Sequence, residues 1–392
     1  RTAVGTTVAL RHLIDYNFNN SPANSDPNLP WSTQLEGEVR QPLLQGAGVE
    51  FNRIAGPNAT PGVYHGVVIA RLNADITAAQ LEIALRDFLS DVENAYWDLH
   101  FAYEDLEVKR QARDRSLNTY QLLKARQGLP GAENDKLAQA KEQYYRFEQE
   151  VQNSLAGRLF VGTRNFNGSG AGTFQGTGGV YVNERRLRMI MGLPINDGRL
   201  IRTSSNPIDI PVTYQWNDVI ANALTRRTEL RRQRLQVDRR QHELTAARNF
   251  LLPRLDAVGR YRYRALGDSL YDTNIWDNQP ISTGRHEWLM GFSLEYPVGL
   301  RRAHSAVRNA QLQLARERAL MDELERQVVY GLSNAIAESD RAYKVLRVAL
   351  NREEAARDQY EILAGEAQAK IRQFDFNSLL DSEQRYAEAS TA

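Results

Sequence analysis

The chain has 392 residues, of which 42% are hydrophobic and 25% are charged, and this composition excludes disordered and collagen-like proteins. The formal net charge is +1, which argues against a nucleic-acid-binding protein because such proteins usually carry a clear basic excess. Cysteine is absent, which excludes disulfide bonds, cysteine-based zinc and iron–sulfur sites and thiol catalysis.

The first part of the chain predicts two β-strands, because apolar and polar residues alternate with a period of two. These strands cover about 4–18 and 31–43, and the turn-rich segment 19–30 between them is predicted to be an exposed loop. Each strand is longer than the usual ~5–6 residues and comparable to the ~9–11 residues of a tilted membrane-spanning strand.

Two long helices are predicted next, over about 76–126 and 133–159, since apolar residues recur every three or four positions without an internal proline. A helix of about fifty residues spans about 75 Å, which indicates a coiled coil or a helical tube. The glycine-rich segment 162–180 is predicted to be a flexible loop. A short helix at 181–191 and a proline-containing stretch to Pro211 follow it, and we expect a small side domain against the middle of the helices.

The second half of the chain repeats this order of elements. The predicted elements are a helix at 217–250, strands at 252–264 and 287–297, their loop at 265–286, and helices at 301–371 and 377–392. A proline follows the second strand of each pair, Pro42 and Pro297, and ends sheet pairing because proline has no N–H to donate.

Each predicted strand has one apolar face and one charged face. Aromatic residues lie near the ends of the apolar faces, as in the interfacial girdles of outer-membrane barrels. We expect the charged faces to line the water-filled lumen of a barrel. The predicted lumen residues are Arg11, Asp15, Glu36, Glu38, Arg40, Arg254, Asp256, Arg260 and Arg262. The alternative is a soluble β-sandwich that carries the same residues on its outer surface.

The duplication of two strands and a long helical hairpin supplies four strands per chain. Four long amphipathic strands cannot close a barrel alone, because small membrane barrels have about eight strands. No apolar run of the sequence approaches the roughly 18–20 residues of a membrane-spanning helix, so a membrane-crossing form must be a closed barrel. We therefore expect an oligomer, in which a dimer would have eight strands and a trimer twelve.

Short motifs follow one another in a characteristic order along the chain. They are Arg188-Met189-Ile190-Met191-Gly192-Leu193-Pro194, Thr228-Glu229-Leu230, Ala247-Arg248-Asn249-Phe250-Leu251-Leu252-Pro253-Arg254-Leu255 and Leu379-Leu380-Asp381-Ser382-Glu383-Gln384. With the strand–proline–helix arrangement, they make nearly the whole chain resemble the outer-membrane efflux protein family, the TolC-like outer-membrane factors.

The resemblance implies a mixed α and β fold with an internal two-fold repeat. It implies a homotrimer in the bacterial outer membrane, with a twelve-stranded transmembrane β-barrel, a long periplasmic coiled-coil tunnel of helices and a small equatorial domain. It also implies a passive export conduit of a tripartite efflux or type I secretion system, with a periplasmic adaptor, an inner-membrane pump and outer-membrane lipid as partners. No enzyme activity, cofactor, metal or nucleic-acid partner is expected.

The domains predicted on this basis follow the repeat. They are a first β-hairpin (1–51), a first helical hairpin (52–162), an equatorial domain with its loop (163–216), a helix leading back to the barrel (217–251), a second β-hairpin (252–297) and a second helical hairpin (298–392). Family members have a helix before the first strand, often after a lipidated cysteine, and a longer final helix. Neither is present, and we expect this chain to be trimmed at both ends.

The resemblance places constricting acidic residues just after the turn of each helical hairpin. Asp381 matches such a position, Ser378 stands where a nearby acid is expected, and Asp135 and Asn134 occupy the corresponding region of the first half. A ring of three carboxylates would attract cations. The alternative for Asp381 is an ordinary solvated helix residue, and Asp375 is interpreted as a helix cap.

The exposed turns between the helices are the predicted contact with the adaptor. The candidate residues are Arg126, Gly128, Leu129, Arg372 and Phe374. For Gly128, the alternative is a purely conformational role in the turn.

No motif in the sequence supports catalysis. The histidines are scattered without a pair four residues apart, the glycine-rich 168–179 segment lacks the Gly-Lys-Ser/Thr of a phosphate loop, and no Gly-x-Ser-x-Gly element occurs. The alternative to a channel is therefore not an enzyme either. It is a non-channel coiled-coil scaffold of the cell envelope, in which the strands form a soluble sheet.

Overall fold

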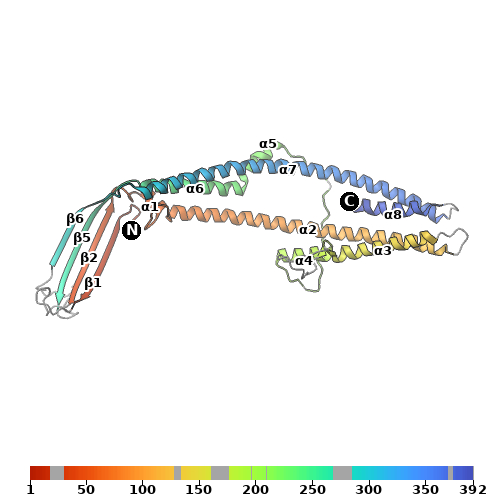
Figure 1. Ribbon diagram of the computed structural model, residues 1–392, viewed down its shortest axis with the longest axis horizontal. Coiled ribbons are helices and arrows are strands. Elements are labelled where there is room, and N and C mark those ends of the chain that lie inside the picture. The colour runs from red at the N-terminus through yellow and green to blue at the C-terminus, as the bar shows by residue number, and fades with distance from the viewer. Residues whose placement is uncertain are drawn as a thin grey trace. The chain divides into compact units, whose positions relative to one another are not determined.

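The computed structural model describes residues 1–17, 31–127, 134–159, 176–195, 197–208, 210–267, 285–369 and 374–391. The chain divides into two compact units. The first unit comprises Arg1–Ile83 and Ile220–Val329, and the second comprises Ala84–Val219 and Tyr330–Ala392. Two long helices, α2 (Val67–Ala125) and α7 (Arg301–Gln368), belong partly to each unit (Figure 1).

The first unit contains a four-stranded antiparallel sheet in the order β1-β2-β5-β6 (Figure 1). Its strands are β1 (Thr7–Tyr16), β2 (Trp31–Pro42), β5 (Arg254–Gly267) and β6 (Arg285–Glu295). The four strands predicted from the period of two are thereby confirmed. β5 continues to Gly267 and β6 begins at Arg285, so both extend into the segment predicted to be a loop.

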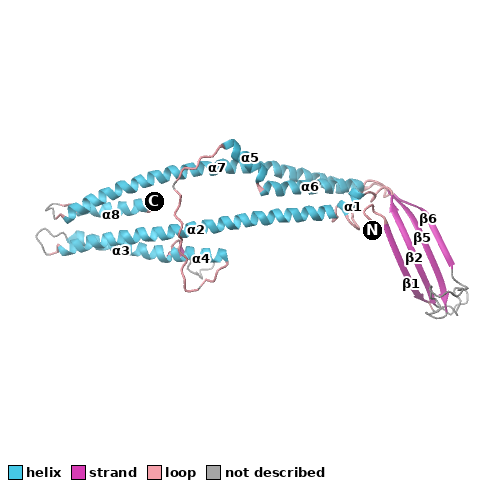
Figure 2. Cartoon of the chain, turned by 180° about the vertical axis from the view of Figure 1, so that it is seen from behind, coloured by secondary structure: helices cyan, strands magenta, loops and turns pink. Residues whose placement is uncertain are grey.

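The two hairpins of the repeat join in the centre of this sheet, where β2 pairs with β5. In the described part of the chain, no strand pairs with the outer edge of β1 or of β6. Figure 2 shows that no helix of the first unit covers either face of the sheet. As far as the structure describes the chain, the sheet therefore has two open edges and no helix over either face.

A small apolar core connects the sheet to the helices of the first unit. It includes a short helix, α1 (Val49–Ala55), which the sequence analysis did not predict, and the returning helix α6 (Thr228–Asn249). Phe51 of α1 meets Phe250, next to α6, edge to face with ring centroids 5.4 Å apart. The other buried members of the cluster are Ile54, Ala55, Ile69, Ala246 and Ala303.

The single helix predicted over 217–250 is wrong in one respect, because the structure has two helices there. α5 (Trp216–Arg226) ends before Arg227, whose backbone is extended, and α6 begins at Thr228. The break is consistent with the contacts of the next residue, since the Thr228 hydroxyl donates to Glu82 of α2. Helical periodicity continues across the break, which explains why the sequence pattern does not reveal it.

The second unit is a packing of helices around short apolar stripes. Besides parts of α2 and α7, it contains α3 (Asn134–Ala156), α4 (Val180–Met191) and α8 (Phe376–Ser390). One cluster packs α2 against α3 and α4, and another packs the ends of α2 and α7 against α3 and α8. A two-residue pairing, β3 (Arg158–Leu159) with β4 (Gly176–Thr177), lies close to the ends of the predicted glycine-rich loop.

The motif that begins at Arg188 has a structural explanation. Gly192 ends α4 in the left-handed conformation, with a φ of 69°, and the chain then turns back toward the helix. The buried guanidinium of Arg188 holds that returning segment, because it donates to the carbonyl oxygens of Pro194 (2.7 Å) and Arg199. It also pairs with Asp197 at 2.9 Å and keeps the pKa of that carboxyl below its ordinary value.

None of the described helices is both long enough and apolar enough to cross a membrane.

Replacing Gly66 with alanine is expected to destabilise the first unit. The added methyl group would overlap the backbone of Arg53 and Ile54, where α1 and the start of α2 approach each other. Overpacking of this kind costs about 1–3 kcal/mol. The matched control is Gly331→Ala in α7, where a methyl group would meet open space and the free energy of unfolding should rise by about 1 kcal/mol. Thermal unfolding in detergent measures both, and an unchanged midpoint for Gly66→Ala would contradict the assigned packing.

Candidate functional site

One face of the sheet carries a row of charges that alternate in sign across all four strands. Arg11, Glu36, Arg262 and Glu287 occupy paired positions on β1, β2, β5 and β6. Glu36 accepts from Arg11 and from Arg262, each at 2.7 Å, and Arg262 reaches Glu287 at 3.2 Å. Ordinary cross-strand pairing places these side chains together, because opposite residues of neighbouring strands point to the same face.

A second set of ion pairs continues this face toward the helices. Glu38 pairs with Arg260 at 2.9 Å and with Arg40 at 3.2 Å. Asp256 pairs with Arg254 at 3.0 Å and with Arg40 at 3.5 Å. The structure therefore unites eight of the nine predicted lumen residues in one network; Asp15 lies apart, exposed and opposite Ser32.

Within this network the acids and the arginines differ in exposure. Glu36 and Asp256 are buried, at 4% and 2% exposed, whereas the Arg11 side chain is 52% exposed. The guanidinium groups cover the carboxylates, so the arginines contribute most of the solvent-accessible charge around these carboxylates. The sequence predicted which residues share the face, but periodicity alone does not reveal this layering.

The opposite face of the sheet is apolar and exposed. Met290, Phe292 and Leu10 are 81%, 77% and 78% exposed. Aromatic pairs cross the strands on this face, with Tyr261 4.6 Å from Trp288 and Tyr16 4.7 Å from Trp31 between ring centroids. A contiguous apolar surface of this kind requires a non-aqueous environment or a partner.

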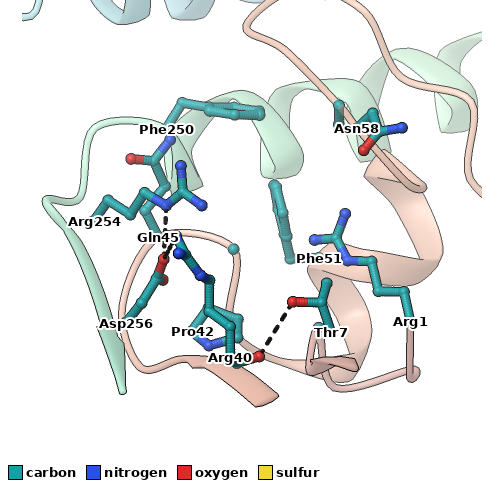
Figure 3. Close-up of a pocket in the computed structure, with 13 residues that line it drawn as sticks. Arg1, Thr7, Arg40, Pro42, Gln45, Phe51, Asn58, Phe250, Arg254 and Asp256 are labelled. Carbon is teal, nitrogen blue, oxygen red and sulfur yellow. Dashed lines mark hydrogen bonds and ion pairs between the residues drawn. The ribbon is translucent and has the colours of Figure 1, made fainter. Parts of the chain in front are cut away.

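A pocket of about 300 Å³ lies where the polar face of the sheet meets α1 and the end of α6 (Figure 3). Phe51 and Phe250 form its apolar wall, and Arg1, Arg40, Arg254 and Asp256 supply charge. Figure 3 shows Arg254 directed at Asp256, the ion pair of the network above. Because Arg40 and Arg254 are both engaged with Asp256, this pocket is an extension of the charged face.

The predicted constriction residues lie at the starts of α3 and α8. Asn134 and Asp135 begin α3 and are exposed, and the Lys136 ammonium donates to Asn377 Oδ1 of α8 at 2.5 Å. Asp381 is exposed and pairs with Arg385 one turn later at 2.8 Å. The structure thus brings the two helix starts together within one chain and gives the Asp381 carboxylate a local counter-charge.

The interpretation of Asp375 as a helix cap is confirmed. Its carboxylate accepts from the Asn377 backbone N–H at 3.0 Å and from the Ser378 hydroxyl at 2.9 Å. These bonds, that of Ser378 first, hold the pKa of Asp375 below its ordinary value. The hydroxyl of Ser378, one of the candidate constriction residues, is therefore committed to the cap.

The predicted adaptor-contact residues are only partly described. Gly128, Leu129 and Arg372 lie outside the described residues. Arg126 donates to the Ala367 carbonyl oxygen at 2.9 Å and stands over the Phe376 ring, 5.1 Å from its centroid. Phe374 meets Phe376 edge to face at 5.1 Å. Both residues thus have a structural role in joining the ends of α2, α7 and α8.

Glu383 is a buried acid that the sequence analysis named only as part of a motif. Its carboxylate lies between α2, α3 and α8, and burial raises its pKa to about 7. A signal was present in the sequence, because Phe376, Leu379, Leu380 and Ala387 form the buried stripe of α8 and position 383 lies in the same stripe. Among the described residues, no cluster of three or more His, Asp or Glu side chains is placed to hold a metal ion.

Replacing Glu36 with glutamine is expected to lower the thermal stability of the sheet. The change removes the shared negative partner of Arg11 and Arg262 and leaves two guanidinium groups facing each other across the strands. The matched control is Glu295→Gln, because that carboxylate is 73% exposed and lies 3.9 Å from Arg254. Heating in detergent, followed by the β-sheet circular dichroism signal, compares the variants. Equal midpoints would show that the charged row does not stabilise the sheet.

Comparison with solved structures shows which fold this is. The chain superposes on the outer-membrane protein VceC of Vibrio cholerae with a TM-score of 0.69 and 13% identity, over 99% of this chain and 82% of the other. The outer-membrane channel OprN gives a TM-score of 0.70 and 14% identity, over 99% and 77%. The CmeC outer-membrane channel of Campylobacter jejuni gives a TM-score of 0.65 and 13% sequence identity, over 99% of this chain and 74% of the other.

No protein-family model matches the sequence, and no curated protein matches it. The likeness is therefore one of three-dimensional structure at low sequence identity, and it extends over almost the whole chain. The chain has the fold of the outer-membrane channels.

Proposed function

We propose that the chain is one protomer of a homotrimeric channel in the bacterial outer membrane. In this proposal the protein is a passive export conduit from the periplasm to the outside and has no catalytic activity. The observation that carries the proposal is the sheet, which has one apolar face and one charged face and whose two edges are unpaired among the described residues. The fold shared with VceC, OprN and CmeC supports it.

The two faces of the sheet fit the wall of a membrane pore. The face that contains Met290 and Phe292 would contact lipid, and the charged row of Arg11, Glu36 and Arg262 would line the water-filled lumen. A β-structure in lipid must close on itself, because an open edge leaves backbone N–H and C=O groups without partners. Because one chain supplies four strands, three chains give a barrel of twelve.

The second unit would then be part of a periplasmic tunnel. In that arrangement α3 and α8 bring Asp135 and Asp381 toward the constriction, and a ring of three Asp381 carboxylates would attract cations. The turn residues Arg126, Gly128, Leu129, Arg372 and Phe374 would contact a periplasmic adaptor that links the channel to an inner-membrane pump. The segment around α4 would form the equatorial domain.

Single-channel recording of the purified protein in planar bilayers tests the proposal directly. We expect discrete conductance steps and detergent-solubilised particles with threefold symmetry, because three sheets are needed to close the barrel. A detergent-independent soluble monomer without conductance would contradict the channel and favour a scaffold of the cell envelope.

The Asp381→Asn variant tests the assignment of the constriction. Removal of three carboxylates from one ring should weaken block by added multivalent cations, because the ring loses its negative charge. The matched control is Glu361→Gln in α7, which removes an exposed carboxylate of the same unit, 3.7 Å from Arg357. Cation block that is the same in Asp381→Asn and wild type would exclude Asp381 from the constriction.

A further inference from the structure

Glu383 lies in the middle of a buried polar cluster of the second unit. We call it the Glu383 cluster; its members are Arg115 and Thr119 of α2, Gln143 of α3, Tyr360 of α7, and Glu383 and Tyr386 of α8. Ser116, three residues before Thr119 on α2, is also fully buried. Apolar side chains flank it on either side along α8, with Leu379 and Leu380 before it and Ala387 after it. The helix that carries Asp381 therefore has a titratable group that is only 2% exposed.

The carboxylate of Glu383 connects α8 to two other helices. Thr119 Oγ1 of α2 donates to Glu383 Oε1, and Gln143 Nε2 of α3 donates to Glu383 Oε2 at 3.3 Å. Gln143 Nε2 also donates to the Leu380 carbonyl oxygen at 3.1 Å, so this amide is shared between two acceptors on α8. Neutral donors thus supply both hydrogen bonds to the carboxyl group.

No cation pairs with Glu383 among the described residues. Arg115 is the charged group that faces it from α2, and it stands over the Tyr386 ring, 4.2 Å from the centroid, and 5.7 Å from that of Tyr360. The titratable groups on α7 and α8 that face it are these two tyrosines, and the facing side chain on α3 is the neutral Gln143. Arg115 Nε and Ser116 Oγ are buried without hydrogen-bond partners.

This environment favours the neutral carboxyl group. Burial of a carboxylate that has only neutral partners costs free energy, so Glu383 retains its proton to higher pH and its pKa rises to about 7 from the ordinary 4.5. An exposed Glu383 would ionise near the ordinary value. The packed state therefore binds more protons than the opened state. The stability that the protonated Glu383 contributes to the packed state is fully present below about pH 4.5, and it is lost progressively as the pH rises through about 7.

We propose that Glu383 is a positioning residue that holds α8 against α2 and α3 while its carboxyl group is protonated, and that ionisation of Glu383 releases α8. The ionised state would then exchange the Thr119 and Gln143 bonds for water.

The consequence for the constriction rests on the proposed function, whereas the release of α8 does not. Asp381 lies two residues before Glu383 on the same helix, so a movement of α8 would move the proposed carboxylate ring. A channel built in this way would open more readily at neutral or alkaline pH than at acidic pH.

The sequence has no cysteine, so one introduced thiol can report on the cluster. Ser116→Cys replaces a side chain that is 0% exposed and has no hydrogen-bond partner, and its reaction with a maleimide requires the cluster to open. The full-length protein in detergent is labelled at pH 6 and pH 8, with and without Glu383→Gln, which keeps the shape but cannot ionise. At each pH, the labelling rate with Glu383 is divided by the labelling rate with Glu383→Gln. This ratio cancels the intrinsic pH dependence of the thiol, which is the same in both proteins.

We expect that ratio, wild-type Glu383 over Glu383→Gln, to rise about tenfold between pH 6 and pH 8, as the two ionisation constants require. The matched control is Asp381→Asn, which removes an exposed carboxylate two residues away and should leave the pH dependence unchanged. A ratio that does not change with pH would overturn the proposal. This outcome would overturn the role of Glu383 even if the protein forms pores. Conversely, a protein that forms no pores could still show the predicted rise, so the two proposals fail independently.

A second measurement needs no substitution. Amide hydrogen exchange of α8, corrected for the intrinsic pH dependence, should accelerate between pH 6 and pH 8 relative to the amides of α6. Equal corrected protection of α8 at the two pH values would overturn the proposal independently of how the variants fold.

Discussion

The backbone groups along the outer edges of β1 and β6 impose the constraint on which the rest of the structure depends. In the described chain the sheet ends at these two strands, and its N–H and C=O groups there face outward. A long open edge with an exposed apolar face is prone to uncontrolled pairing in water and is forbidden in lipid. The proposed trimer would remove both edges by pairing them with each other, so the assembly completes a fold that one chain leaves unfinished.

The charged face shows how the same sheet can carry many ionic groups without a large excess of either sign. Buried carboxylates such as Glu36 and Glu38 each receive two or more guanidinium groups, and these arginines remain partly exposed. Each buried acid of this face therefore has ionic partners within the sheet. Glu383 is the opposite case, since its hydrogen-bond partners are a neutral hydroxyl and a neutral amide, and its burial favours the protonated form. Burial without a paired cation is therefore what raises the pKa of Glu383 to about 7.

Periodicity predicted much of this architecture. Alternation of apolar and polar residues located the four strands, because each strand has one exposed apolar and one charged face, and the three-to-four repeat located the long helices. Local backbone events were not predictable in that way. The α5–α6 break at Arg227 and the short helix α1 depend on contacts with α2 and Phe250, which are distant in sequence. Of the candidate site, eight of the nine predicted residues share the charged network, whereas Asp15 lies apart and Glu287 was not predicted. The placement of Glu383 in a buried stripe was not predicted, because the sequence analysis considered this residue only as part of a motif.

The pairing of β2 with β5 has a consequence for how the protein can be made. These strands are adjacent in the sheet, yet partners such as Glu36 and Arg262 are 226 residues apart in sequence. No tight turn can set their register, and a slip by one residue would exchange the two faces. Loop closure over such a distance is slow. The hairpin of β1 and β2 therefore cannot pair with β5 until the second half of the chain has been synthesised. Its apolar side chains stay uncovered during that interval, and we expect a chaperone to bind them.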